Sequence, residues 1–492
     1  MAVNSSEYSR LKNLFEEAGQ GHVFTFWDTL PESQQAELIA NLKGIDPVRC
    51  NRIFKQTVHS TDENLTGGKA DLQPLPKEAF SSVIELGSKS AEVEKWRLTG
   101  LGLIAQNKVG VILLAGGQGT RLGSSQPKGC YDILLPSRKS LFQLQAERIR
   151  RLQHLASGIA GAKTPVVIPW YVMTSGPTRL ATETFFKQHD YFGMDPCNVV
   201  FFEQGVLPAF DSHGRILMET PTTPAVAPDG NGGIYAALRT QGVLSDLSKR
   251  GIPYVHAYCV DNCLVKVADP TFIGYCVAKH AEMGCKAVPR RSESEPVGVV
   301  CRRDDRYAVV EYSEMDASLA ALRRGGELVF RAANIANHFY TADFLAGVCA
   351  AAFETQLAYH VAKKKIKHVD LATAQRVAPA APNGIKLELF IFDVLPHASR
   401  VAVLEVPRAE EFSPLKNAPG CADGDSPDTS RADIMQLHAA YLRRAGAIIE
   451  KGDDEPVDVV EISPLASYEG EDLHAYSGKV VRTPVHIQAS GV

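Results

Sequence analysis

The sequence predicts an α/β fold built around a mostly parallel, mixed sheet that helices cover. From about residue 108, short runs rich in β-branched residues alternate with helical stretches, which is typical of parallel sheets. The chain also has 492 residues, too many for one hydrophobic core. We expect a helical N-terminal domain (1–100), a central domain that contains the sheet (101–398) and a small α+β C-terminal domain (399–492).

Single elements follow from apolar periodicity and from capping residues. Ser140 and Gln143 stand as a capping box, so a helix is expected to begin after Ser140. The polar stretch 61–78 contains Gly and Pro and is expected to be a linker or long loop, and 417–430 a surface loop. The expected strands are 109–115, 166–173, 199–202, 255–260 and 297–300, with Pro169 weakening the second.

Composition and charge exclude several classes of protein. Lys and Arg number 52 and Asp and Glu 56, and the net charge of −4 excludes a broadly basic nucleic-acid binder. No apolar run approaches the roughly 20 residues of a membrane-spanning helix, so no membrane association is expected. The polar N-terminus lacks the apolar core of a signal peptide, and the last residues are no peroxisomal address. We expect a cytoplasmic protein and leave import into an organelle open.

The ten cysteines contain no Cys-x-x-Cys pair. Cys259 and Cys263 are closest in sequence and would be the candidates for a metal or redox site. Because Cys259 lies in an apolar, strand-like run, we favour buried thiols in a reducing compartment.

A glycine-rich loop after the first expected strand is the strongest functional signal. It extends from Leu114 to Lys128 and has glycines at positions 116, 117, 119 and 123. The first three are expected to allow positive φ and close approach of a ligand, and consecutive N–H groups there can form an anion site. Arg121 and Lys128 add positive charge. A plain βα turn would explain a lone Gly-Gly pair but not this longer string.

Two common phosphate loops are excluded by counting. The dinucleotide pattern Gly-x-Gly-x-x-Gly fails from Gly117, because Leu122 stands where glycine is required, and from Gly116, because Gln118 does. The Walker A pattern requires Lys followed by Ser or Thr after its second glycine, and neither follows here.

The string Gly-Gly-x-Gly-Thr-Arg-Leu-Gly followed by Pro-Lys resembles the signature of sugar-nucleotide pyrophosphorylases of the UDPGP type. The longer text LLAGGQGTRLGSSQPKGCYDILLPSRKSLFQLQAERI is similar to the eukaryotic UDP-N-acetylhexosamine pyrophosphorylases in particular. The family's further blocks recur in order, at APDGNGG (227–233), YCVDNCLVKVAD (258–269), EPVGVV (295–300), VEYSE (310–314), NIANHF (334–339), PNGIK (382–386) and FSPLKN (412–417). The first hundred and last seventy residues match more loosely.

The resemblance implies that 101–398 is a Rossmann-like catalytic nucleotidyltransferase domain. Its reaction joins UTP to N-acetylglucosamine 1-phosphate and releases pyrophosphate, as a UDP-N-acetylglucosamine diphosphorylase of amino sugar metabolism. The oxygen of the sugar phosphate attacks the α-phosphorus, assisted by Mg²⁺, for which Mn²⁺ can substitute. We expect a monomer or homodimer whose partners are these small molecules.

The resemblance also assigns site residues. The catalytic ones are Arg121, Lys128 and Lys416, and Asp261 is the metal ligand. Nucleotide contacts fall to Leu114, Ala115, Gly116, Gly117, Lys128, Gln204, Gly230, Asp261 and Lys386. Sugar-phosphate contacts fall to Asn231, Gly298, Glu311, Tyr312, Asn334 and Lys416.

The residues alone leave alternatives open at several of these positions. Asp261 follows an expected strand, where a carboxylate suits Mg²⁺ or caps the next turn equally well. Gly230 and Asn231 lie in a sequence that also favours a plain turn. Glu311 and Tyr312 fit an ordinary solvated strand, although a carboxylate can accept hydrogen bonds from sugar hydroxyls. Isolated lysines such as Lys386 and Lys416 are usually solvated.

Other residues bear on specificity. The amide of Gln204 can match the donor and acceptor of a uracil edge, and the amide of Asn334 suits an N-acetyl group. Cys130, Ile133-Leu134, Arg331 and Ala333 depart from the family text, which puts the sugar preference in doubt more than the reaction. The competing hypotheses are a UDP-hexose pyrophosphorylase acting on glucose or galactose phosphates and a non-catalytic sugar-nucleotide sensor.

Overall fold

The computed structural model describes residues 5–66, 71–452 and 458–489, and of residues 59–66 the backbone only. These residues form two compact units. The larger unit comprises Asp71–Glu203, Ala237–Ala351 and Val394–Val492. The smaller unit comprises Met1–Ala70, Gln204–Ala236 and Ala352–Asp393. The three domains expected from the sequence, with borders near residues 100 and 398, stay a prediction.

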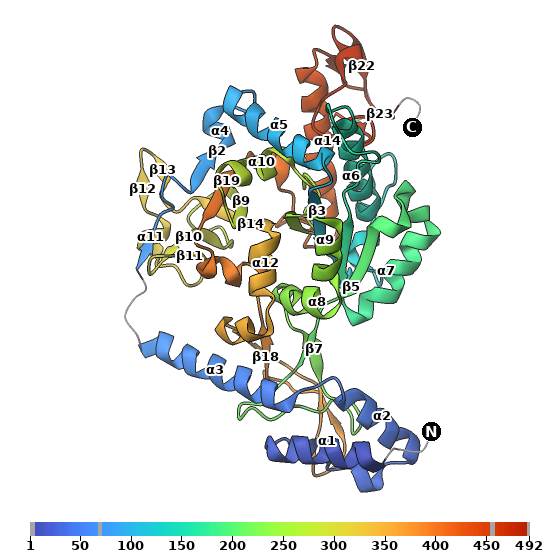
Figure 1. The fold of residues 1–492 in the computed structure, drawn as a ribbon, viewed down its shortest axis with the longest axis vertical. Coiled ribbons are helices and arrows are strands. Elements are labelled where there is room, and N and C mark those ends of the chain that lie inside the picture. The colour runs from blue at the N-terminus through green and yellow to red at the C-terminus, as the bar shows by residue number, and fades with distance from the viewer. Residues whose placement is uncertain (1–4, 67–70, 453–457, 490–492) are drawn as a thin grey trace. The chain divides into compact units, whose positions relative to one another are not determined.

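A single large sheet organises the larger unit (Figure 1). β14 is antiparallel to both of its neighbours, β8 and β9, whereas the other pairs along the main path are parallel. The predicted mostly parallel, mixed sheet is therefore confirmed. In spatial order the path comprises β2 (Phe80–Ser82), β19 (Val401–Glu405), β9 (Met283–Pro289), β14 (Ala332–Thr341), β8 (Tyr254–Cys259), β3 (Val109–Leu114), β4 (Trp170–Thr174) and β5 (Val199–Glu203).

A short antiparallel extension leaves this path at β14. β10 (Val299–Arg303) pairs with β14, with β11 (Arg306–Val310) and with β1 (Leu72–Gln73). β12 (Arg323–Arg324) and β13 (Glu327–Leu328) form a separate small hairpin.

The expected strands agree with β3, β5 and β8 to within one residue at each end. Two predicted starts are wrong: β4 begins at Trp170, directly after Pro169, and β10 begins at Val299. A proline has no N–H for a ladder, so the chain joins the sheet only beyond Pro169. The linker expected at 61–78 is also wrong at its start, because α3 continues to Thr66. The polar residues Asp, Glu and Asn in this stretch do not break a helix. Residues 67–70 lie outside the described part.

Helices cover the sheet, and close glycine contacts set one of the helix pairs. α5 (Ala91–Ala105) and α10 (Pro270–Ala278) lie side by side in Figure 1. A Cβ on Gly100 would lie 2.0 Å from the carbonyl oxygen of Pro270, so no larger residue fits there. The other helices of this unit are α4 (Val83–Leu86), α6 (Leu141–Ser157), α7 (Gly176–Gln188), α9 (Val243–Arg250), α11 (Ala317–Ala320), α12 (Ala342–Val348), α13 (Arg408–Glu411) and α14 (Pro427–Arg444), and α8 (Ile234–Thr240) begins in the smaller unit.

The start of α6 bears out one half of the predicted capping box. Ser140 Oγ accepts the backbone N–H of Gln143 at 3.2 Å, as an N-cap does. The side chain of Gln143 instead donates to Glu147 Oε1 at 3.0 Å, one turn further along the helix. The other half of the predicted capping box, a bond between the Gln143 side chain and the backbone N–H of Ser140, is therefore wrong.

The C-terminal segment packs on the region that carries the glycine-rich loop. Leu122 and Leu141 share one apolar core with Leu437, Leu442 and Ile462. Two parallel two-stranded ribbons complete the small α+β segment that the sequence predicts. They pair β20 (Ile448–Glu450) with β22 (Val480–Arg482) and β21 (Val460–Ile462) with β23 (Val485–Ile487).

The smaller unit joins the predicted N-terminal helices to short ribbons. Phe15, Leu38 and Ile53 from the helices share a core with Phe210 and Leu389. Among the described residues, none of the helices is long and apolar enough to span a membrane. The elements of this unit are α1 (Ser5–Glu17), α2 (Glu32–Leu42), α3 (Pro47–Thr66), β6 (Val206–Pro208), β7 (Val226–Pro228), β15 (His360–Lys364), β16 (His368–Val369), β17 (Arg376–Val377) and β18 (Gly384–Glu388).

Candidate active site

The glycine-rich loop lies at the carboxyl ends of β3, β8 and β4. Leu114 ends β3, and its carbonyl oxygen accepts the N–H of Val260, which follows β8, at 3.1 Å. Ala115 donates to the carbonyl of Met173 in β4 at 2.8 Å. The carbonyl of Gly116 accepts Ser175 Oγ at 2.7 Å. This edge of an open α/β sheet is where ligands bind, so the loop is placed as its sequence predicts.

The conformation of the loop differs from the expectation in one respect. Its glycine with positive φ is Gly123 (φ +75°), whereas Gly119 has φ −79° and the glycines at 116 and 117 are not left-handed either. Gly119 lets two parts of the loop approach each other closely, because a Cβ there would lie 3.0 Å from the carbonyl oxygen of Gln126. Gly117 is exposed, and no described atom lies within 4 Å of the place a Cβ would take.

Lys128 connects the loop to the end of β8. Its Nζ lies 3.5 Å from Asp261 Oδ2 and donates to the carbonyl oxygen of Leu415 at 3.1 Å. The side chain of Lys128 is 17% exposed and that of Asp261 30% exposed, so both still reach solvent. The next residue, Lys416, lies 3.7 Å from Asp425 Oδ2 and is half exposed. Two predicted cations and the predicted metal ligand therefore gather at one edge of the sheet.

Arg121 is the third predicted cation of this edge. It lies in the 3₁₀ turn Thr120–Leu122 and is exposed. Within the described residues, its guanidinium has no hydrogen-bond or ion-pair partner, so it is available to an anionic ligand.

Asp261 does not cap the turn that follows it. That task falls to Asn262, whose Oδ1 accepts the N–H of Leu264 at 3.2 Å. Of the described His, Cys, Asp and Glu side chains, no three gather into a metal-binding group. One carboxylate suits Mg²⁺, which keeps several waters and binds substrate phosphates as well. The donor set fits a cation that arrives with a nucleotide, not a permanently caged metal.

Three of the predicted sugar contacts lie together. The N–H of Asn334 donates to the carbonyl oxygen of Gly298 at 2.8 Å. A Cβ on Gly298 would lie 3.0 Å from Glu311 Oε1, so glycine lets the carboxylate approach this backbone. A β-bulge lies between Asn334 and His338 in β14, and bulges commonly re-aim side chains beside active sites.

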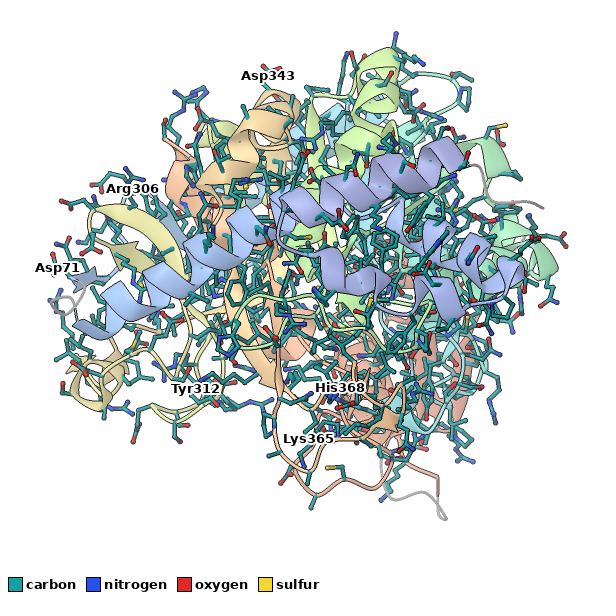
Figure 2. All side chains as sticks on the ribbon, turned by 90° about the horizontal axis from the view of Figure 1, so that it is seen from below. Asp71, Arg306, Tyr312, Asp343, Lys365 and His368 are labelled. Carbon is teal, nitrogen blue, oxygen red and sulfur yellow. The ribbon has the colours of Figure 1, made fainter. Side chains whose placement is uncertain are left out.

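Tyr312 follows Glu311 and lies in the same surface region of the larger unit. Its ring is 50% exposed, and Figure 2 labels it. It is thus accessible to a ligand as the sequence predicts.

The smaller unit holds the remaining predicted residues. Gly230 has φ +87°, and a Cβ there would lie 2.2 Å from the carbonyl oxygen of Leu389, so only glycine fits. Asn231 Oδ1 accepts the N–H of Ile391 at 2.9 Å, which fixes this loop. Gln204 is 9% exposed. Lys386 lies on β18 opposite Ala362 of β15 and, among the described residues, has no ion-pair partner.

Asp229 precedes these loop residues and was not singled out from the sequence. It is 3% exposed, and burial raises the pKa of its carboxyl to about 6. The places of Cβ atoms on Gly205 and Gly233 lie 2.7 Å and 1.9 Å from its oxygens, so the carboxyl fills the space between the two glycines. Its Oδ1 has no hydrogen-bond partner among the described residues. The Asp-Gly pair in APDGNGG was the available signal.

The model of the UDPGP family, described as UTP–glucose-1-phosphate uridylyltransferase, matches residues 50–437, more than half of the chain. The chain belongs to this family. It is 45% identical over 481 residues to the UDP-N-acetylglucosamine pyrophosphorylase of Saccharomyces cerevisiae, covering 95% of this chain and 97% of that protein. It is 47% identical over 481 residues to the UDP-N-acetylhexosamine pyrophosphorylase-like protein 1 of Xenopus tropicalis, covering 94% and 92%.

Solved structures agree with this membership of the UDPGP family. The crystal structure of the Trypanosoma brucei UDP-N-acetylglucosamine pyrophosphorylase, in complex with an inhibitor, superposes with a TM-score of 0.84 at 29% identity, covering 100% of this chain and 99% of that one. The Leishmania major UDP-glucose pyrophosphorylase shares the fold alone, with a TM-score of 0.55 at 16% identity over 85% of each chain. The chain is thus a nucleotidyltransferase, a class that typically uses a divalent metal, and its homologues act on UTP and sugar phosphates.

The cysteines do not contribute a redox or metal site at this edge. All ten are free thiols. Cys263 is 2% exposed, and burial raises the pKa of its thiol to about 12; burial also raises the pKa of the Cys259 thiol. Neither forms a reactive thiolate near neutral pH. Cys263 is a buried thiol as expected, whereas Cys259 is only partly buried.

Proposed function

We infer that this chain forms UDP-N-acetylglucosamine and pyrophosphate from UTP and N-acetylglucosamine 1-phosphate. Two observations together carry this conclusion. Relatives named for this activity align along more than nine-tenths of both chains, and the residues that the resemblance assigns to phosphates gather at the sheet edge where α/β proteins bind ligands.

The reaction requires positioning and charge neutralisation, and no side-chain nucleophile. An oxygen of the sugar phosphate forms a new bond to the α-phosphorus of UTP, the bond from that phosphorus to the bridging oxygen breaks, and pyrophosphate leaves with the bonding electrons. Both reactants are anions, so cations must offset their repulsion. We assign Arg121 and Lys128 to the departing pyrophosphate and Lys416 to the sugar phosphate.

The backbone of Leu114–Gly117 and the side chain of Asp261 complete the nucleotide site of the larger unit. Of the loop N–H groups, we assign those of Gly116 and Gly117 to the phosphates, because the N–H of Ala115 already bonds the carbonyl oxygen of Met173. Asp261 holds Mg²⁺, or Mn²⁺ in its place, which supplies charge neutralisation at the phosphate oxygens when bound. Asp261 is available for this because its carboxylate caps no turn and contacts Lys128 alone at 3.5 Å among the described side chains.

Substrate recognition is divided among the remaining residues. Asn334, Gly298, Glu311 and Tyr312 are proposed to contact the N-acetylated sugar. Gln204 is proposed to contact the uracil, Gly230 the nucleotide, Asn231 the sugar phosphate, and Lys386 a phosphate of the nucleotide. The ten free thiols support the cytoplasm as the compartment. We also propose that the enzyme acts as a monomer or homodimer.

A UDP-hexose pyrophosphorylase and a non-catalytic sensor are the less favoured functions. The family description names glucose 1-phosphate, but the relatives that align over the whole chain are named for N-acetylated sugars. The intact set of Arg121, Lys128, Asp261 and Lys416 argues against a sensor that has lost catalysis.

The test is release of pyrophosphate by the purified protein with UTP and Mg²⁺. N-acetylglucosamine 1-phosphate, N-acetylgalactosamine 1-phosphate, glucose 1-phosphate and galactose 1-phosphate are supplied in parallel. We expect the highest kcat/KM with N-acetylglucosamine 1-phosphate. A clear preference for glucose 1-phosphate would favour the hexose alternative, and silence with all four sugars would overturn the proposed activity.

A further inference from the structure

A segment from the C-terminal part of the chain crosses the end of β8, next to Asp261. This segment, Glu411–Lys416, is here called the strap. The N–H of Leu415 donates to the carbonyl oxygen of Asp261 at 2.8 Å, and the N–H of Cys263 donates to the carbonyl oxygen of Ser413 at 2.9 Å. The strap therefore pairs with the turn that carries the proposed metal ligand, although the two lie far apart in sequence.

The side chain of Asn262 strengthens this pairing. It is 3% exposed. Its Nδ2 donates to the carbonyl oxygen of Glu411 at 2.7 Å, and its Oδ1 accepts the N–H of Ser413 at 3.0 Å and that of Leu264 at 3.2 Å. One buried amide thus ties the first half of the strap to the turn beside Asp261.

Buried charges and hydroxyls fix the strap from its other side. The carboxylate of Glu411 bonds the fully buried Lys286 and lies 3.6 Å from Lys266. Ser413 Oγ donates to Asp433 at 2.7 Å. The strap is accordingly held between the protein interior and Asn262.

Groups assigned to the reaction lie on the outer side of the same pairing. Lys416 ends the strap, and the carbonyl oxygen of Leu415 accepts Lys128 Nζ at 3.1 Å. Asp261 needs no help from the strap to stay in place, because it follows β8 almost directly and β8 is bonded on both sides in the sheet. Asn262 bonds the strap itself, at Glu411 and at Ser413, three residues before Lys416.

We propose that Asn262 is a positioning residue that sets the place of Lys416 relative to Asp261. The proposal rests on the proposed function, since Lys416 and Asp261 act there on the sugar phosphate and on the metal-bound nucleotide. Asn262 contacts no substrate, because it is buried and its side chain bonds backbone groups of Glu411, Ser413 and Leu264. Shifting a reacting group by about 1 Å can cost about 100-fold in rate, so a loosened strap lowers turnover without removing a charge.

The test is a double-mutant cycle between Asn262→Ala and Lys416→Ala, measured as kcat and as KM for both substrates. In the otherwise unchanged protein, Asn262→Ala is expected to lower kcat about 100-fold and to change the KM for UTP little. In the Lys416→Ala background the same substitution is expected to cost only a small factor, because the group it misplaces is already gone. Equal losses in both backgrounds would overturn the proposal, because they would show that Asn262 does not act through Lys416.

Two further variants keep the test decisive. Asn262→Asp keeps the Oδ1 acceptor and the shape but sets a carboxylate oxygen against the carbonyl oxygen of Glu411, so it is also expected to lower kcat, and Lys416→Ala should again suppress that loss. Gln153→Ala removes another amide that holds a backbone N–H, that of Ile168 at 2.9 Å, away from this edge, and should leave turnover unchanged. Melting temperatures of all variants identify losses caused by unfolding. An inactive unmodified protein would contradict the proposed function, whereas an active one with multiplicative losses contradicts only the role of Asn262.

Discussion

The ammonium group of Lys128 lies 3.5 Å from the Asp261 carboxylate, and this contact joins the glycine-rich loop to the end of β8. The same ammonium donates to the carbonyl of Leu415 at 3.1 Å. Three segments that are distant in sequence therefore meet at one cation. Both side chains remain partly exposed, so the pair can open to admit a phosphate and a metal ion.

Lys128→Ala should impair turnover far more than folding. Loss of one preorganised charge at a transition state typically costs about 100- to 1,000-fold, and we expect kcat/KM to fall by that order. A single ion pair that still reaches solvent contributes only about 0–1 kcal/mol to stability, so the melting temperature should change little. Steady-state pyrophosphate release and thermal melting measure the two effects. The matched control is Lys108→Ala, which removes a lysine that donates to the Gly251 carbonyl at 3.3 Å, before the start of β3. Unchanged turnover in Lys128→Ala would refute the assigned role.

Asp261→Asn should raise the concentration of Mg²⁺ needed for activity. An amide cannot neutralise a cation as a carboxylate does, so the half-saturating Mg²⁺ concentration should rise by about 10- to 100-fold. A chelator should abolish turnover in the unmodified protein, and added Mg²⁺ should restore it. Asp246→Asn serves as control, because Asp246 bonds Tyr171 and Arg250 instead. An identical Mg²⁺ dependence in Asp261→Asn would remove Asp261 from the metal site.

Asn334→Ala tests the basis of sugar selectivity. The backbone N–H of Asn334 bonds Gly298, so the substitution keeps that pairing, but it also removes the bond from the Ala336 N–H to Asn334 Oδ1 at 3.1 Å, and the melting temperature must be measured alongside. Loss of a hydrogen bond to the N-acetyl group should lower kcat/KM for N-acetylglucosamine 1-phosphate by about 10-fold or more. The slower rate with glucose 1-phosphate should hardly change. Equal losses with both sugars would show that Asn334 acts on something they share.

The pH dependence of stability should reveal Asp229. Because its folded pKa of about 6 lies above the ordinary value, folding favours the protonated form. Ionisation of Asp229 therefore lowers the free energy of unfolding. This loss is absent at pH values below the unfolded pKa, grows between about pH 4 and 6, and is complete above pH 6, where it reaches about 3 kcal/mol. Asp229→Asn has no such contribution. The free energy of unfolding of this variant, relative to the unmodified protein, should therefore increase from pH 4 to pH 7 in denaturant titrations. A constant difference over that range would contradict the shifted pKa.

Sequence patterns predicted the parts of this protein whose cause is local. The buried run at 109–115 became β3, and the glycine string placed its loop beyond the strand end. Residue type alone led to two wrong predictions. The positive φ expected at the first three glycines of the loop occurs at Gly123, and the polar residues 61–66, expected in a loop, continue α3.

Residues whose role depends on distant segments could not be found from the sequence. Asn262 differs from any buried amide only through its contacts with Glu411 and Ser413, about 150 positions later. In the sequence Lys286 is an ordinary strand lysine, and only the fold places its ammonium group 2.5 Å from the Asp269 carboxylate and beside that of Glu411. Asp229 is a common turn residue until folding buries it between two glycines.

The central claim is that a sugar-phosphate oxygen attacks the α-phosphorus of UTP. It is tested most directly with N-acetylglucosamine 1-phosphate whose phosphate carries the heavy oxygen isotope ¹⁸O, followed by mass spectrometry of both products. The account predicts that every labelled oxygen, including the one bonded to the sugar, appears in UDP-N-acetylglucosamine and that pyrophosphate is unlabelled. Label in the pyrophosphate, or no UDP-N-acetylglucosamine at all, would contradict it.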